Sequence, residues 1–121
     1  MARKTDPLRM AIIDALAQSA MTRRQLREIV IHQIPPGDAF RVGQYNLERK
    51  RLRTAPARPR DLAREQIMMA GRNHLFAHMV NDLRRRGYVG VNRRSPRADD
   101  VITLIRVPPA IAFERRTKAA A

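Results

Sequence analysis

The chain of 121 residues contains no cysteine. This absence excludes disulfide bonds, thiolate zinc sites and a cysteine nucleophile together, and it is what a reducing cytoplasm tolerates. No run approaches the roughly 20 consecutive apolar residues that a membrane-spanning helix needs. Residues 1–6 lead into no signal-like apolar core. We therefore expect a cytoplasmic protein that does not engage a membrane.

Signals for catalysis are also missing. The sequence has no glycine-rich phosphate loop, and its two serines, Ser19 and Ser95, do not lie in a nucleophile-elbow pattern. Asp99 and Asp100 precede a β-branched segment that contains no lysine, so they do not complete a nuclease centre. We expect no enzymatic activity, no cofactor and no small-molecule substrate.

Acidic residues are few. Eleven Asp and Glu stand against 25 Lys and Arg, which gives a formal net charge of +14. A compact body with this charge attracts polyanions, and nucleic acid is the commonest of them because each neutralised phosphate releases counterions. GC-rich coding and phosphate binding explain the choice of arginine over lysine equally well, but GC-rich coding does not explain the excess of positive charge.

Aromatic residues make up only 4% of the chain. Modules that read unpaired bases use exposed aromatic side chains as stacking platforms. The scarcity therefore disfavours single-strand recognition by stacking.

Two short helices are expected in the first quarter of the chain. Asp6 followed by Pro7 is a typical helix start, with an N-cap side chain and a proline in the first turn. Apolar residues then recur at helical spacing to about Gln18. Thr22 and Gln25 form the pattern of a capping box for the second helix. Such a pair matches the beginning of a helix-turn-helix.

Residues 38–60 are predicted to form a basic loop or insertion. The second helix is expected to stop before Ile34–Gly37, where two prolines precede a glycine. The expected pieces that follow are a loop at Asp38–Gly43, a basic helical turn at Tyr45–Arg53 and an extended linker at Arg53–Arg60. With its excess of basic residues, the segment either lies against phosphates or extends into solvent.

A longer helix and a hairpin are predicted after residue 60. Asp61 is expected to cap a helix that Gly71 interrupts, and a longer helix follows from Asn73 to Arg86, closed by Gly87. Period-two patterns at 88–91 and 101–107, joined by a polar turn, predict a two-stranded hairpin with a basic tip. The tail is expected to pack Ile111 and Phe113 against the body.

The longer helix divides into two faces. Phe76, Met79, Val80 and Leu83 recur at the spacing of a buried face. The predicted outer face carries Asn73, His74, Ala77, His78, Asn81, Arg84 and Arg85. Amides and arginines are the side chains that make bidentate contacts to adenine and guanine in the major groove. The hairpin adds Arg93, Arg94 and Arg97, which suit phosphates or a narrow minor groove.

This order of elements resembles the winged helix-turn-helix superfamily, and residues 7–107 are similar to the N-terminal winged-helix module of Mrr-type restriction endonucleases. The matching stretches are Ile12–Leu16, Thr22–Glu28, Gly71–Phe76 and Val80–Val89. The resemblance implies an α+β, mostly α fold with three or more helices followed by a two-stranded basic wing. It also implies DNA binding through the helix at 73–86. Residues 1–6 are then an N-terminal arm and residues 108–121 a C-terminal tail.

These observations predict a double-stranded DNA-binding protein, a bacterial or phage transcriptional regulator or DNA-masking factor associated with the nucleoid, acting alone or as a homodimer. The predicted DNA-binding residues are Arg51, Arg53, Arg72, Asn73, His74, His78, Asn81, Arg84, Arg85, Arg93, Arg94 and Arg97. One alternative is a protein-interaction module that docks on an acidic host protein, and another is structured-RNA binding.

A metal site is considered and not predicted. His74, His78 and Asp82 fall at i, i+4 and i+8 on one helical face. Zinc requires a further strong ligand from elsewhere, and neither a cysteine nor another histidine pair supplies one.

Overall fold

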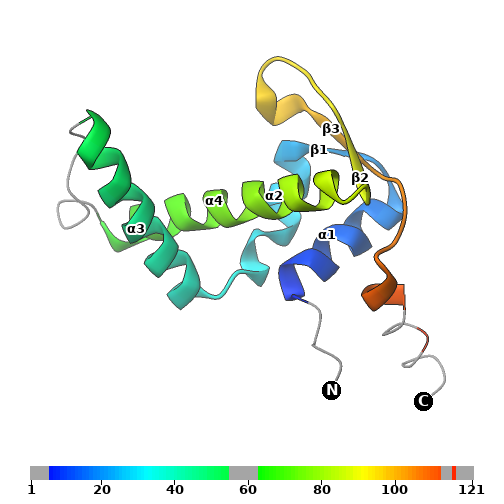
Figure 1. The fold of residues 1–121 in the computed structure, drawn as a ribbon, viewed down its shortest axis with the longest axis horizontal. Helices are drawn as coiled ribbons and strands as arrows, with labels where there is room; N and C mark the ends of the chain where they lie inside the picture. Colours follow the sequence, from blue (N-terminus) through cyan, green and yellow to red (C-terminus); the bar gives the residue numbers. More distant parts are fainter. Residues whose placement is uncertain (1–5, 55–62, 113–115, 117–121) are drawn as a thin grey trace. The chain divides into compact units, whose positions relative to one another are not determined.

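The structure, a computed structural model, describes residues 6–54, 63–112 and 116, without the side chains of residues 50–54. The elements in chain order are α1 (Pro7–Gln18), β1 (Met21–Thr22), α2 (Arg23–Val30), a 3-10 turn (Ile31–Gln33), α3 (Pro36–Thr54), α4 (Arg64–Arg85), β2 (Val89–Asn92), a 3-10 turn (Arg97–Asp99) and β3 (Val101–Leu104) (Figure 1). The fold is α+β and mostly α, as predicted.

The chain forms two compact units. The first comprises Met1–Val30 and Met79–Ala121, and the second comprises Ile31–His78. Helix α4 is continuous from the second unit into the first, so its last two turns belong with α1, α2 and the sheet. No helix in the described ranges combines the length and apolar character that a bilayer crossing requires.

Both helix starts predicted in the first unit are confirmed. The Asp6 carboxylate accepts a hydrogen bond from the Leu8 N–H at 2.8 Å, and Pro7 lies in the first turn of α1. Thr22 and Gln25 form the predicted capping box, because the Thr22 N–H donates to the Gln25 amide oxygen at 3.0 Å and the Gln25 N–H donates to the Thr22 hydroxyl at 3.2 Å. These bonds satisfy N–H groups that a helix start leaves without partners.

The predicted end of α4 is confirmed as well. Gly87 adopts a φ of +80°, a left-handed conformation that favours glycine. The turn is closed by the Tyr88 N–H, which donates to the Leu83 carbonyl at 2.9 Å. The chain then enters β2.

The sheet of the first unit has a strand that the sequence did not predict. Its described strands lie in the order β1-β3-β2, and all the pairs are antiparallel. Ile102 on the central strand β3 is opposite both Val91 on β2 and Met21 on β1. The sequence predicted only the two strands β2 and β3, and the structure adds β1 as a third. Strand β1 is too short for a period-two pattern, and only its pairing with β3 reveals it.

The core of the first unit consists of the apolar faces of α1, α2 and the end of α4, packed on the sheet. Its buried apolar residues are Leu8, Ile12, Ile13, Ala15, Leu16, Leu26, Val30, Val80, Leu83, Val89, Ile102 and Ile111. The predicted packing of Ile111 against the body is confirmed, whereas Phe113 lies outside the described residues. The inner face predicted for α4 is confirmed for Phe76, Val80 and Leu83, which are buried, whereas Met79 is half-buried.

In the second unit, the prediction of a loop at Asp38–Gly43 was wrong, whereas the helical turn predicted at Tyr45–Arg53 lies within a helix. Residues 36–54 form the helix α3, which begins at Pro36, so the prolines start a helix instead of only ending one. Proline suits a first helical turn because the N–H it lacks would have no partner there. The linker residues 55–60 and the expected cap Asp61 lie outside the described residues.

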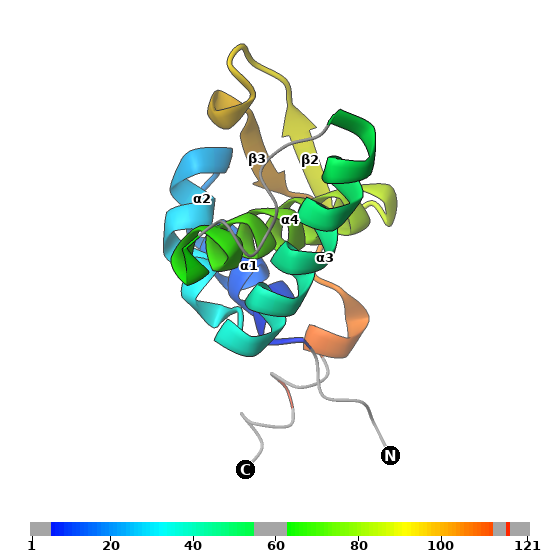
Figure 2. The same cartoon turned by 90° about the vertical axis from the view of Figure 1, so that its left-hand side faces the viewer.

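The prediction that Gly71 interrupts a helix was also wrong, because α4 continues through it. A Cβ atom added at Gly71 would overlap the carbonyl of Ala39, and one added at Gly43 would overlap the carbonyl of Ile67. The two glycines therefore let the backbones of α3 and α4 approach closely where the helices cross (Figure 2). This close packing offsets the poor helix propensity of glycine.

Candidate nucleic-acid interface

The last two turns of α4 expose polar side chains above a buried apolar face. Val80 and Leu83 are fully buried, and Asn81, Arg84 and Arg85 are exposed. The outer face predicted from the helical period is confirmed for these three residues. An amide and two guanidinium groups thus lie within two helical turns of each other.

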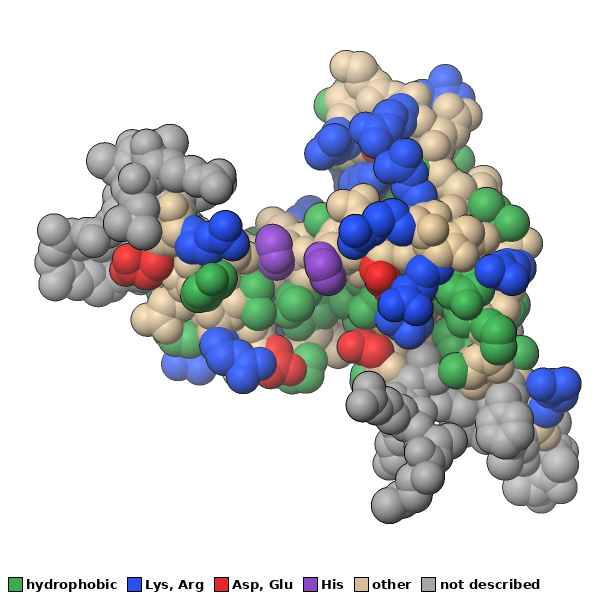
Figure 3. All heavy atoms as spheres, in the orientation of Figure 1, with side chains coloured by type: hydrophobic (Ala, Val, Ile, Leu, Met, Phe, Trp, Pro, Cys, Tyr) green, Lys and Arg blue, Asp and Glu red, His purple; other side chains and the backbone are tan. Residues whose placement is uncertain are grey.

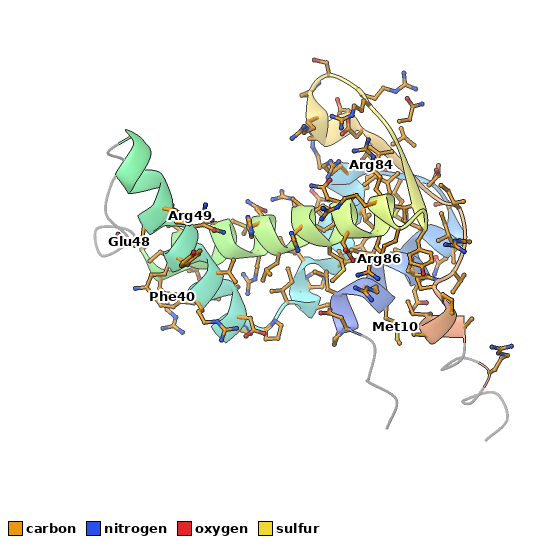
Figure 4. All side chains as sticks on the ribbon, in the orientation of Figure 1. Met10, Phe40, Glu48, Arg49, Arg84 and Arg86 are labelled. Atoms are coloured by element: carbon orange, nitrogen blue, oxygen red, sulfur yellow. The ribbon has the colours of Figure 1, made fainter. Side chains whose placement is uncertain are left out.

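Arg86, the third arginine of the run, is held by the protein itself. Its Nε lies 3.2 Å from the Asp82 carboxylate, which also accepts a hydrogen bond from Arg9 at 3.3 Å. Figure 4 shows Arg84 and Arg86 on opposite sides of α4, with Arg86 on the side of α1. The run of three arginines therefore contains two exposed residues without an ion pair in the described ranges and one, Arg86, that is also exposed but pairs with Asp82.

The β2–β3 loop, residues 93–100, exposes Arg93, Arg94 and Arg97. Asp100, whose side chain is buried, stabilises the shape of this loop. The Asp100 carboxylate accepts hydrogen bonds from the Arg94 N–H at 2.7 Å and from the Arg23 guanidinium at 3.3 Å. One carboxylate therefore links the start of the loop to helix α2.

The same contacts shift the acidity of Asp100. The hydrogen bond from the Arg94 N–H lowers the pKa of Asp100, burial opposes this effect, and the nearby charges of Arg23 and, more weakly, Arg93 add to it. The Arg23 N–H also donates to the Asp100 carbonyl at 2.7 Å. Sequence reasoning missed this positioning role, because Asp100 was considered only as a nuclease acid and its partner Arg23 is distant in the sequence.

Nine of the described arginines of the first unit fall into two groups. Arg9, Arg23, Arg24 and Arg86 form ion pairs with Asp82, Asp99 or Asp100. Within the described ranges, no ion pair is found for the second group, which consists of Arg84, Arg85, Arg93, Arg94 and Arg97. Figure 3 shows basic side chains gathered over the β2–β3 loop and the end of α4 in this unit. We call the second group the arginine surface.

The six predicted site residues that precede Asn81 in the sequence belong to the second unit and not to the arginine surface. Asn73, His74 and His78 are exposed on α4 but lie in the second unit, and Arg72 there is half-buried. The rings of His74 and His78 are nearly parallel, with centroids 6.2 Å apart. The side chains of Arg51 and Arg53 lie outside the described residues, although their backbone belongs to α3.

The described part of the chain contains no cluster of three or more His, Cys, Asp or Glu side chains that could hold a metal ion. Asp82, which shares a helical face with His74 and His78 in the sequence pattern, instead binds Arg9 and Arg86.

Comparisons with protein families, with curated proteins and with solved structures found no match for this chain. The similarity to Mrr-type modules thus stays a prediction. The geometry and charge of the arginine surface are the basis for the functional conclusion.

Proposed function

We propose that this protein binds double-stranded DNA through a winged-helix domain formed by its first unit. The order α1, β1, α2, end of α4, β2 and β3, with β1 paired to β3, supports a winged helix. In this proposal the second unit is an insertion of α3 and most of α4 ahead of the recognition turns. Such an insertion explains why the stretch between the second helix and the recognition helix is long.

The observation on which the proposal rests is the division of the arginines. Arg9, Arg23 and Arg86 pair with the less exposed carboxylates of Asp82 and Asp100, and Arg24 forms a weaker, exposed pair with Asp99. The arginine surface has no ion pair in the described ranges. Five guanidinium groups concentrated in this way repel one another, and phosphates relieve the repulsion. A regularly spaced polyanion such as DNA can engage several of them together.

The two parts of the arginine surface have different roles in the proposal. The end of α4 enters the major groove, where Asn81 suits adenine and Arg84 and Arg85 suit guanine or the flanking phosphates. The β2–β3 loop acts as the wing, and its arginines grip phosphates or a narrow minor groove. Asp100 keeps the wing in place and does not contact DNA.

The biological role that fits this chemistry is a bacterial or phage transcriptional regulator or DNA-masking factor located at the nucleoid. Such proteins use backbone contacts for affinity and a few base contacts for selection. A homodimer would place two such domains on neighbouring half-sites.

Fluorescence anisotropy with a labelled random-sequence DNA duplex tests the proposal. We expect binding at 50 mM salt that weakens steeply by 200 mM salt, because phosphate contacts release counterions. Duplex RNA of the same length should compete poorly. A lack of binding to duplex DNA at 50 mM salt would refute the proposal, and tighter binding to duplex RNA would support the RNA alternative.

A pull-down after nuclease treatment provides a second test. If a protein partner remains bound at high salt while the purified chain does not bind duplex DNA, the first unit is a protein-interaction module. Selection from random duplexes then determines whether the DNA binding that we expect has any sequence preference.

A further inference from the structure

The second unit contains a groove that the proposed DNA interface does not use. Its volume is about 430 Å³, within the range of small-molecule sites. Helix α3 lines it with Arg41, Tyr45, Asn46 and Arg49, and helix α4 lines it with His74 and His78. The same two helices are in backbone contact at Gly43 and Gly71, so regular helices form the walls of the groove.

The polar lining of the groove is rich in hydrogen-bond donors. Among the described residues that line the groove are two arginines and two histidines, and none is Asp or Glu. The side-chain Nδ2 of Asn46 is buried and has no hydrogen-bond partner among the described residues. The lining therefore fits an anionic ligand that carries acceptor atoms.

Both arginines can turn to a ligand at little cost. The Arg41 guanidinium lies 3.1 Å from Asp38, but this ion pair is well exposed and hence weak. Arg49 lies over the Tyr45 ring, with its guanidinium carbon 5.8 Å from the ring centroid. Neither contact holds a buried charge, so a phosphate could attract both groups without breaking a strong interaction.

The rings in the groove indicate the body of the ligand. Tyr45 is 62% exposed, although tyrosine usually buries its ring. The nearly parallel rings of His74 and His78 add flat surfaces from the facing helix. Aromatic faces of this kind stack on planar heterocycles, as they do in nucleotide-binding proteins.

We infer that this groove binds a nucleoside monophosphate, with Arg41 and Arg49 at the phosphate and the ring side chains against the base. The ligand is an organic phosphate and is distinct from the DNA of the proposed function. The inference assigns His74 and His78 to this ligand instead of to DNA. It does not depend on DNA binding by the first unit.

Isothermal titration calorimetry of the full chain with AMP and GMP tests the inference, with adenosine and inorganic phosphate as separate arms. We expect saturable one-to-one binding of at least one nucleotide, and at least about tenfold weaker binding of each fragment, because each fragment retains only half of the contacts. Inorganic phosphate that binds as tightly as the nucleotides would contradict the role of the rings. Adenosine that binds as tightly would contradict the role of the arginines.

Two matched substitutions locate the site. Arg49→Gln, at an exposed position, should weaken nucleotide binding at least about fivefold, because it removes one charge-assisted contact. Arg84→Gln, which changes the net charge equally but lies in the first unit, should leave nucleotide binding unchanged. The reverse pattern would place the nucleotide on the arginine surface and overturn the inference, as would the lack of saturation with either nucleotide.

The same proteins distinguish this inference from the proposed function. If nucleotides bind in the groove while duplex DNA does not bind, the inference holds and the proposed function fails. If Arg49→Gln weakens duplex binding and nucleotides do not bind, the groove belongs to the DNA surface and the inference is wrong. Circular dichroism of each variant verifies that it is folded.

Discussion

Replacing Arg84 by glutamine should flatten the salt dependence of DNA binding, whereas the same change at Arg86 should not. The two residues lie close together at the end of α4, are both exposed and differ in their partners, because Arg86 pairs with Asp82 at 3.2 Å. Loss of Arg86 leaves Asp82 with its second partner, Arg9, at 3.3 Å. The variants therefore have equal net charge and differ in whether a guanidinium faces the proposed DNA.

The arginine surface sets the magnitude. If all five of its arginines contact phosphates, the slope of log K against log salt is about −4.5, at about −0.9 for each contact. Affinity then falls roughly 500-fold between 50 and 200 mM salt. Arg84→Gln should reduce the slope to about −3.6 and the fall to roughly 150-fold. Arg84→Gln combined with Arg94→Gln should give about −2.7 and roughly 40-fold.

Anisotropy titrations at four salt concentrations measure these slopes for the wild type and the variants on one duplex. Urea unfolding of each variant verifies that stability is unchanged, as expected for exposed positions. Equal slopes for Arg84→Gln and Arg86→Gln would refute the division of the arginines into two groups. A wild-type slope near zero would refute phosphate contacts altogether.

Three further predictions concern the framework of the two units. Gly71→Ala should lower the free energy of unfolding by about 1–3 kcal/mol, because the added methyl overlaps a backbone carbonyl. The control Gly37→Ala adds its methyl in open space, so it should leave the free energy of unfolding unchanged or raise it by up to about 1 kcal/mol. Urea unfolding measures both variants. Thr22→Ala should cost about 1 kcal/mol in the same assay through loss of the capping box, and an unchanged midpoint would contradict that role. Asp100→Asn should be less stable than the wild type at neutral pH, where the carboxylate is ionised in both folded and unfolded chains. Folding lowers the pKa of Asp100, so the stabilisation that its ionised carboxylate provides is present above the unfolded pKa of about 3.9 and is lost as the pH falls through the lower pKa of the folded chain. A stability difference between wild type and Asp100→Asn that widens in acid would contradict this assignment.

The sequence alone determined the features that depend on near neighbours in the chain. The cap at Asp6, the capping box of Thr22 and Gln25, and the left-handed turn at Gly87 all involve residues within five positions of each other. The outward direction of Asn81 followed from the helical period in the same way. Such hydrogen bonds and faces are local, so the residue types at fixed spacing are sufficient to predict them.

Helix α3 and the continuity of α4 were decided by tertiary packing. Gly43 and Gly71 read as helix breakers in the sequence, because glycine gains less than other residues from helix formation. In the folded chain they are the points of closest approach between two helices, and a side chain at either one would prevent that approach. A pattern along one segment cannot show which other segment will cover it.

The arginine surface was determined only in part by the sequence. Composition predicted an excess of positive charge, and the helical period predicted the exposure of Arg84 and Arg85. Which arginines are neutralised internally depended on partners far along the chain, since Arg9 meets Asp82 across 73 positions and Arg23 meets Asp100 across 77. Coulomb attraction acts over a few ångströms in space and is indifferent to sequence separation, so only the folded chain selects these ion pairs.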